Sequence, residues 1–359
     1  MSRSVDVVRV ADKPSLALRR FRTSARHARS IGGGTLLPTV AGPVSTIESL
    51  RPAAGSRSLA AGDAMSHLRH ELGVLTFEVL VVDGQPIPGR PAPDGSPSMW
   101  SPTSATLICG EKRAVLIDGL TTKEHAAALI DWIDGRGLEL QTIYVTHGHG
   151  DHFFGLGPLV ARHPGAEVVA LTEVVDRMQE QTSPEVYDSL WGPLFGDQIP
   201  EEIVKAVPLE GDRIDLEGHS LLVHRAGHSD RSDTTFVHVP ELDLVVAGDI
   251  VYNGVFPYTV DTDRASRDEW RQALDAIAAC KPSRVVAGHK APTADDDRRH
   301  IAETRKFLDD FDAALDSGAP PEEIFDSLVA THHDRLNRTA LWVGISVQAH
   351  HRDKQSTHR

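Results

Sequence analysis

Short runs of hydrophobic residues alternate along the chain with amphipathic stretches, and Gly, Pro and Asp separate them. Apolar or β-branched runs of about four to eight residues between turn signals predict buried strands. The pattern predicts strands at 75–82, 106–109, 113–117, 142–145, 167–171, 203–207, 213–216, 220–224, 234–239, 242–247 and 284–287. The strands therefore fall into two groups, one in each half of the folded region.

Helices are predicted between and after these strands. Thr121-x-x-Glu124 matches a capping box that opens a helix ending near Asp134, and Ser266-x-x-Glu269 opens another that ends near Ala279. Further helices are predicted at 153–161, in the first part of 172–196, and at 295–317, 321–332 and 338–347. Strands, βα units, more strands and another βα unit predict an α/β fold, a four-layer αββα sandwich with a C-terminal helical extension.

The domain organisation follows from the same pattern. Residues 71–295 are predicted to form one catalytic domain, and the helices of 296–359 are predicted to pack on it and end in a frayed polar tail. Residues 1–70 are rich in Ser, Ala, Gly and Arg without sustained periodicity, which predicts a disordered extension. The alternatives are a targeting peptide and an upstream start codon with Met65 as the working start.

Charge and cysteine content narrow the function classes. The formal net charge is −14, and residues 1–64 carry +6, so residues 65–359 carry −20. This balance argues against a nucleic-acid partner, and no run reaches the roughly 18–20 apolar residues of a membrane span. With only Cys109 and Cys280 in the chain, no disulfide framework is expected. We expect a cytoplasmic protein with a small-molecule substrate, and a homodimer stays open.

The strongest chemical signal is the loop after the predicted strand 142–145. The stretch His147-Gly148-His149-Gly150-Asp151-His152 holds three histidines and an aspartate within six residues. Imidazole and carboxylate are ligands that zinc and similar divalent metals prefer. The alternative is a polar loop with incidental histidines. We expect a metal site.

More ligand-type residues follow the ends of other predicted strands. These are Asp118, His228, Asp249 and His289, and the last three each come directly after a glycine. A strand end is a rigid mount, and glycine gives clearance for an ion. By contrast, His219, His224 and His238 lie within or beside strands and are expected to be sheet residues. Asp230 and Asp233 are expected on a solvated loop, with a polar network near the site as the alternative.

Taken in order, these residues resemble the motifs of the metallo-β-lactamase superfamily over residues 72–291. The motifs are Asp118, His147-x-His149-x-Asp151-His152, His228, Asp249 and His289. The resemblance implies one metal held by His147, His149 and His228, a second held by Asp151, His152 and His289, and Asp249 bridging both. It also implies that Asp118 orients a ligand histidine. Two divalent ions are expected, zinc first, with manganese or iron as alternatives.

The residues around Asp249 bear on the reaction. The β-lactamases proper have cysteine at that position, so the resemblance favours the dinuclear hydrolases, in which a metal-bridging hydroxide attacks a carbonyl. Asp249-x-x-Tyr252 is similar to lactone-hydrolysing members and implies that the Tyr252 phenol contacts the substrate. The alternative is that Tyr252 packs under the loop. Asp151 is expected to move a proton if one metal binds.

A small ester or lactone is therefore the expected substrate. The alternatives are a thioesterase of the glyoxalase II type, a hydrolytic dehalogenase and an iron-dependent oxidoreductase, because all use the same ligand types. Aromatic residues from three segments are candidates for the cavity wall: Trp100, Trp191, Phe195, Phe256 and Tyr258.

Overall fold

The computed structural model describes residues 18–19 and 75–357. The extension predicted for residues 1–70 lies outside the described residues, apart from the short strand β1 (Leu18–Arg19), which pairs antiparallel with β2. The remaining strands are β2 (Thr76–Val82), β3 (Thr103–Cys109), β4 (Arg113–Ile117), β5 (Glu139–Tyr144), β6 (Glu167–Ala170), β7 (Val207–Pro208), β8 (Arg213–Leu216), β9 (His219–Gly227), β10 (Thr234–Val239), β11 (Leu244–Val246), β12 (Tyr252–Asn253), β13 (Arg284–Val286) and β14 (His289–Lys290).

The helices lie between and after these strands. The α-helices are α2 (Lys123–Asp134), α3 (Leu156–Arg162), α4 (Thr172–Gln181), α5 (Pro184–Val186), α6 (Gly192–Phe195), α7 (Arg264–Ala279), α8 (Arg299–Asp316), α9 (Pro321–Thr331) and α10 (Arg338–Thr357). Short 3-10 or π turns are η1 (Gly150–His152), η2 (Tyr187–Trp191), η3 (Gly196–Gln198), η4 (Pro240–Leu242) and η5 (Gly248–Ile250). Within the described part of the chain, no helix is long and apolar enough to cross a membrane.

Two mixed sheets form the centre of the molecule. The first has the order β1-β2-β3-β4-β5-β6-β7, with β14 beside β3 and β12 beside β14, and the second has the order β13-β11-β10-β9-β8. β4, β5, β6 and β7 run parallel, and β11 runs parallel to β13. The chain passes from the second sheet to the first between β11 and β12, and again between β13 and β14.

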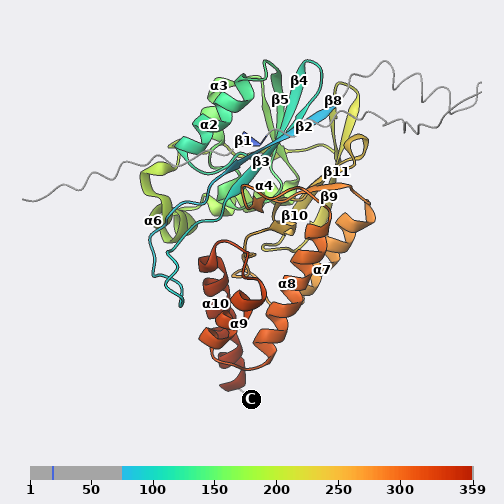
Figure 1. The fold of residues 1–359 in the computed structure, drawn as a ribbon. Coiled ribbons are helices and arrows are strands. Elements are labelled where there is room, and N and C mark those ends of the chain that lie inside the picture. The colour runs from blue at the N-terminus through green and yellow to red at the C-terminus, as the bar shows by residue number, and fades with distance from the viewer. Residues whose placement is uncertain (1–17, 20–74, 358–359) are drawn as a thin grey trace, which may run out of the picture.

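Helices cover both outer faces, which confirms the predicted four-layer sandwich. Figure 1 shows α2 and α3 on one side of the sheets, α7 and α8 on the other, and α9 and α10 below. One core cluster joins the facing sides of the two sheets to α2, α3 and α4, with Leu107 and Val237 fully buried in it. A second cluster joins the outer face of the second sheet to α7, α8, α9 and α10 through Phe236, Trp270 and Leu341.

Both predicted helix caps are displaced in the structure. Thr122, not Thr121, caps α2 by accepting the N–H three residues on, and Thr121 instead donates to the carbonyl of Asp151 at 3.3 Å. At α7 the cap is Asp263, whose carboxylate accepts the N–H of Ser266 at 2.8 Å. Asp and Thr both satisfy the free N–H groups of a helix start, so the spacing alone left the choice of cap open.

Two predicted segments also differ. The strand expected at 203–207 is wrong, because only Val207–Pro208 joins the sheet, while Ile203 and Val204 are half-buried and pack against the edge of the first core cluster. The polar tail expected to be frayed is instead helical as far as Thr357, since α10 continues beyond the end predicted at Val347.

Candidate metal centre and active site

Two groups of buried ligand-type side chains meet where the chain passes between the sheets. One consists of His147, His149, Asp230 and Asp249, and the other of Asp151, His152 and His289, and within each group the ligand atoms lie within 4.8 Å of one another. Asp249 lies between the groups. Its Oδ1 is 3.3 Å from Nε2 of His152, and its Oδ2 is 3.2 Å from Nε2 of His289 and 3.8 Å from Nε2 of His147.

Local structure fixes the loop that follows β5. The carbonyl of Thr146 accepts from the N–H of Thr235 at 3.0 Å and from its hydroxyl at 2.6 Å, which ties the loop to β10. Further along the loop, the N–H of His152 donates to the carbonyl of His149 at 3.1 Å and closes η1. This tight turn brings Asp151 and His152 to the side of the loop where His289 arrives from β14.

Three imidazoles that present Nε2 to the centre are oriented by a hydrogen-bond partner at Nδ1. Nδ1 of His147 lies 3.1 Å from the Thr146 hydroxyl, Nδ1 of His152 lies 3.0 Å from Asp118, and Nδ1 of His289 lies 3.1 Å from the carbonyl of Pro102. Such partners fix the tautomer in which Nε2 keeps its lone pair. All three Nε2 atoms are therefore presented to the centre in the form that binds a cation.

The donor set fits divalent cations of the zinc type. Nε2 of His147, Nε2 of His152 and Oδ1 of Asp249 are buried, and none of the three has a hydrogen-bond partner among the described residues. Buried polar atoms without a partner are costly, at about 1–3 kcal/mol each, and a shared cation satisfies them. At Gly288, an added Cβ would come within 2.1 Å of Oδ1 of Asp249, so this position leaves space that a side chain would fill.

Asp118 contacts both halves of the centre. Its backbone has φ 64°, a conformation that Asp tolerates better than most residues, and it places the carboxylate inward. Oδ2 lies 3.0 Å from Nδ1 of His152, and Oδ1 accepts the N–H of Thr146 at 2.8 Å. The Thr146 hydroxyl donates to the same carboxylate and also contacts His147, so one buried acid acts on a ligand in each group.

The structure does not bring His228 into either group. Its Nδ1 lies 2.8 Å from the carbonyl of Ser229, and its side chain is half-buried. Asp230 lies where His228 was expected. Its Oδ2 is 2.9 Å from Nδ1 of His149 and 3.9 Å from Nε2 of His147. A tight turn explains the exchange, because the N–H of Ser229 donates to the carbonyl of Arg231 and turns Asp230 inward. The solvated loop expected at Asp230 is wrong, since this residue is fully buried.

Asp151 and Tyr252 lie at the boundary between the centre and a cavity. Oδ2 of Asp151 is 3.2 Å from Nε2 of His289 and accepts the indole N–H of Trp100 at 3.1 Å. The Tyr252 hydroxyl donates to Oδ2 of Asp249 at 2.9 Å, and its ring stacks on His289 at 5.6 Å. Tyr252 is fully buried, yet it lines the cavity together with Asp151.

Buried carboxylates raise the pKa of two imidazoles in the centre. Burial alone would lower the pKa of His289, but Asp249 and Asp151 raise it to about 10. Burial would likewise lower the pKa of His149, and Asp230 raises it to about 9. Burial raises the pKa of Asp230 itself. A divalent cation bound among these groups would displace protons from the imidazoles.

The cavity is predominantly apolar. It has a volume of about 290 Å³ and reaches Asp249 and His289 at its inner end. Its walls include Ile87, Trp100, Leu190, Trp191, Leu194 and Trp342. Arg90 is the one Lys or Arg among the described residues that line it.

The structure also shows which aromatic residues form the cavity. Trp100, Trp191 and Tyr258 line it, as the sequence suggested, and the rings of Trp100 and Trp191 lie 5.5 Å apart. Phe256 instead packs in the second core cluster against Phe307 at 5.9 Å.

Sequence reasoning missed the inward position of Asp230 and the hydrogen bond from Trp100 to Asp151. Neither carries a periodic signal, because a loop turn directs the carboxylate of Asp230 and packing against Trp191 directs the indole of Trp100. The order Gly227, His228, Ser229, Asp230 did place a second ligand type two residues after His228. This spacing was the one sequence signal that pointed to Asp230 as a ligand.

Comparisons with known proteins agree with this geometry. A family model described as "Metallo-beta-lactamase superfamily" matches residues 99–289. A metal-dependent hydrolase from Thermofilum pendens is 35% identical over 85 residues, which make up 24% of this chain and 36% of the relative. A hydroxyacylglutathione hydrolase from Prochlorococcus marinus is 34% identical over 89 residues, 25% of this chain and 33% of the relative. The chain spans about a third of the length of these curated relatives.

One solved structure is similar over most of the described chain. It is a metallo-beta-lactamase family protein from Thermus thermophilus, with a TM-score of 0.53 and 21% identity, and the match covers 77% of this chain and 94% of that protein. This likeness bears on the fold alone.

Proposed function

The chain belongs to the metallo-beta-lactamase superfamily, and we propose that it is a metal-dependent hydrolase acting on a small, largely apolar ester or lactone. One observation carries the proposal: an apolar cavity of about 290 Å³ ends on two adjoining groups of buried His and Asp ligands. A carbonyl group at the inner end of the cavity would lie next to both groups, while the rest of the substrate would contact the aromatic walls.

The geometry supports a ligand set for each of two cations. His147, His149 and Asp230 would hold one cation, the group of Asp151, His152 and His289 would hold the second, and Asp249 would contact both. Bound divalent cations, zinc first among them, supply an activated water as nucleophile and polarise the substrate carbonyl. Asp230 replaces the His228 implied by the resemblance.

Three residues would act directly around the substrate. Trp100 holds Asp151 in place through its indole N–H, and Asp151 can accept a proton at the inner end of the cavity. Tyr252 holds Oδ2 of Asp249, and its hydroxyl lines the same space. A phenol has one O–H to donate, so Tyr252 would turn this hydrogen from Asp249 to the oxygen that leaves when an ester or lactone opens.

A thioester is the second candidate substrate, because hydroxyacylglutathione hydrolases are among the relatives. Glutathione carries two carboxylates, and its binding would favour a basic surface. Apart from the proposed ligands, the charged side chains that line the cavity are one Arg90 and one Asp261, so the cavity offers no basic surface. This charge balance favours uncharged substrates. The dehalogenase and the iron-dependent oxidoreductase have no specific observation in their favour.

A substrate panel tests the proposal. Full-length protein loaded with zinc or manganese would be assayed on uncharged lactones, alkyl esters, thioesters and phosphodiesters, each with short and long apolar groups. We expect the highest kcat/KM on a lactone or ester with an apolar side chain, and loss of this activity in Asp249→Ala. Preference for a phosphodiester or for a charged thioester would overturn the substrate assignment, and absence of activity with every metal would overturn the hydrolase assignment.

A further inference from the structure

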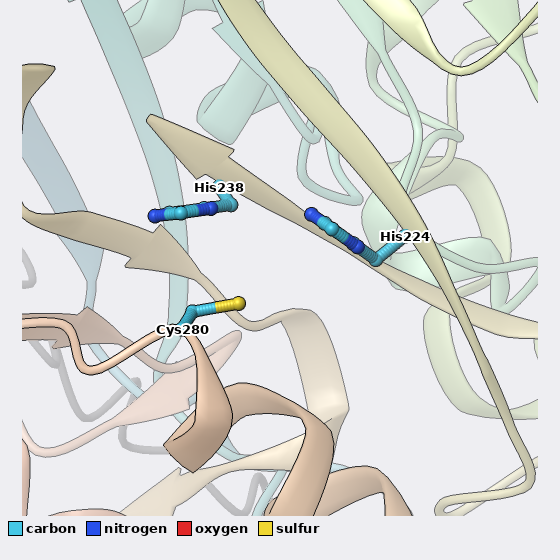
Figure 2. Close-up of side chains that lie close together, drawn as sticks. All are labelled: His224, His238 and Cys280. Atoms are coloured by element: carbon cyan, nitrogen blue, oxygen red, sulfur yellow. The ribbon is translucent and has the colours of Figure 1, made fainter. Parts of the chain in front are cut away.

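A third group of ligand-type side chains lies on the outer face of the second sheet, away from the centre described above. It consists of His224 on β9, His238 on β10 and Cys280, the residue that ends α7. His224 pairs in register with Phe236, and His238 lies two residues further along β10, so both histidines are on the face that α7 covers. Figure 2 shows the three side chains around one space, Cys280 reaching it from the helix end.

The distances suit a shared ion. One ligand atom from each residue lies within 4.8 Å of the other two. In a tetrahedral zinc site with ordinary Zn–N and Zn–S bonds, such atoms are about 3.3–3.6 Å apart. The three side chains are half-buried, so small rotations of His238 and Cys280 would close the remaining gap.

Packing fixes His224 but leaves its ring nitrogen without a partner. The imidazole stacks on Phe236 at 4.7 Å with an interplanar angle of 11°. Its Nε2 is buried and has no hydrogen-bond partner in the described part of the chain. A buried ring nitrogen without a partner is unusual in a folded protein, and an ion between His224 and His238 would satisfy it.

The protonation states also favour metal binding. Burial lowers the pKa of His224 and of His238, so both rings are neutral near pH 7 and offer a lone pair. The carboxylates of Asp212 and Asp243 act on these two histidines in the opposite direction, which adds negative potential beside the group. Burial raises the pKa of the Cys280 thiol, so binding an ion would release one proton to solvent as the thiolate forms.

We propose that His224, His238 and Cys280 form a separate metal site that takes one Zn²⁺ or a similar borderline cation. Two imidazoles and a thiolate select zinc, cobalt or copper over magnesium and calcium, and a water completes the tetrahedron. The site joins the end of α7 to two strands. The same helix carries Trp270, whose indole N–H donates to the carbonyl of Ile250 beside the catalytic centre, so the ion braces the helix that supports that centre.

Titration with cobalt tests the site because the proposed site has a sulfur ligand and the catalytic centre has none. Co²⁺ bound to a thiolate gives an intense charge-transfer band in the near ultraviolet, and the His and Asp ligands of the catalytic centre cannot produce it. Metal-free, full-length protein would be titrated with Co²⁺ beyond the capacity of the catalytic centre. We expect the band in the wild type and in Cys109→Ser, the matched control on β3, and its loss in Cys280→Ser.

Metal content gives an independent readout. Zinc-loaded Cys280→Ser and His238→Gln should each hold about one ion fewer per chain than wild type, with the circular dichroism spectrum unchanged. A wild-type titration without the band would overturn the proposal, and so would a band that persists in Cys280→Ser. If Cys280→Ser is misfolded by circular dichroism, His238→Gln decides: an unchanged zinc content in that variant counts against the site.

Discussion

Replacing Asp118 by Asn should weaken metal binding at both halves of the centre with little effect on the fold. Asn is nearly isosteric and tolerates the positive φ of 64° at this position. Its carbonyl oxygen can still accept the N–H of Thr146, now 2.8 Å from Oδ1. Its NH₂ group, however, would face Nδ1 of His152 and the hydroxyl of Thr146, where a carboxylate oxygen accepts in the wild type.

The magnitude follows from the tautomer of the ring. With a donor at Nδ1, His152 keeps a hydrogen bond only by moving its proton to Nε2, the atom that would bind the cation. Loss of such a supporting carboxylate lowers metal affinity about 10–100-fold, which is about 1.4–2.7 kcal/mol. His147 is affected as well, through the Thr146 hydroxyl that lies 3.1 Å from its Nδ1.

Metal affinity would be measured by competition with a chromophoric chelator, and stability by urea denaturation of metal-free protein. Thr146→Val is the matched control, because it removes the hydroxyl beside His147 and leaves the bond from Asp118 to His152 in place. We expect Asp118→Asn to weaken both ions and Thr146→Val to weaken one. Unchanged affinity for both ions in Asp118→Asn would refute the assigned role of this carboxylate.

Three other outcomes are expected. Asp230→Asn should lower zinc content by about one ion per chain, while His228→Asn should keep the wild-type content by elemental analysis. The reverse result would restore His228 as the ligand. Tyr252→Phe should lower kcat on the best lactone or ester about 10–100-fold, the effect of one lost hydrogen bond to a charged group, with metal content unchanged; an unchanged kcat would return Tyr252 to a packing role. Asp312→Ala should lower the free energy of unfolding, measured in urea, by about 3–5 kcal/mol. The substitution leaves the buried guanidinium of Arg267, 2.7 Å away, without its carboxylate. A loss below about 1 kcal/mol would contradict this reasoning.

The sequence predicted most of the fold because its strands are short apolar runs whose burial both sheets require. The run at 113–117 became β4, and its buried side chains Val115, Leu116 and Ile117 lie in the first core cluster. The strand prediction at 203–207 was wrong because this apolar run is not buried within a sheet. Ile203 and Val204 are apolar but pack only at the edge of that cluster, outside both sheets.

The candidate ligands could be predicted where they follow strands directly. His147 and Asp249 come within three residues of β5 and β11, so the sheets themselves determine where these side chains lie. Asp230 follows β9 at a similar distance, but the turn between Ser229 and Arg231 decides whether Asp230 or His228 points inward. That choice depends on one hydrogen bond, which neither periodicity nor residue type encodes.

The residues that select the substrate lie partly outside the region shared with relatives. The family match covers residues 99–289, which contain every proposed ligand of the catalytic centre. The cavity is closed by two further segments, one with Ile87 and Arg90 before this region and one with Trp342 on α10 after it. These segments contact each other, because the Thr339 hydroxyl donates to the carbonyl of Pro97 at 3.2 Å and Arg338 forms an ion pair with Asp94.

Side chains of α10 therefore form part of the cavity wall, although none of the proposed catalytic ligands lies on this helix. The curated relatives match only 85 and 89 residues of this chain, and the cavity wall includes segments outside the family match, so the substrates of these relatives do not transfer. Substitutions at Trp342 should accordingly change KM and the preferred size of the apolar group, while kcat on the smallest substrates stays the same.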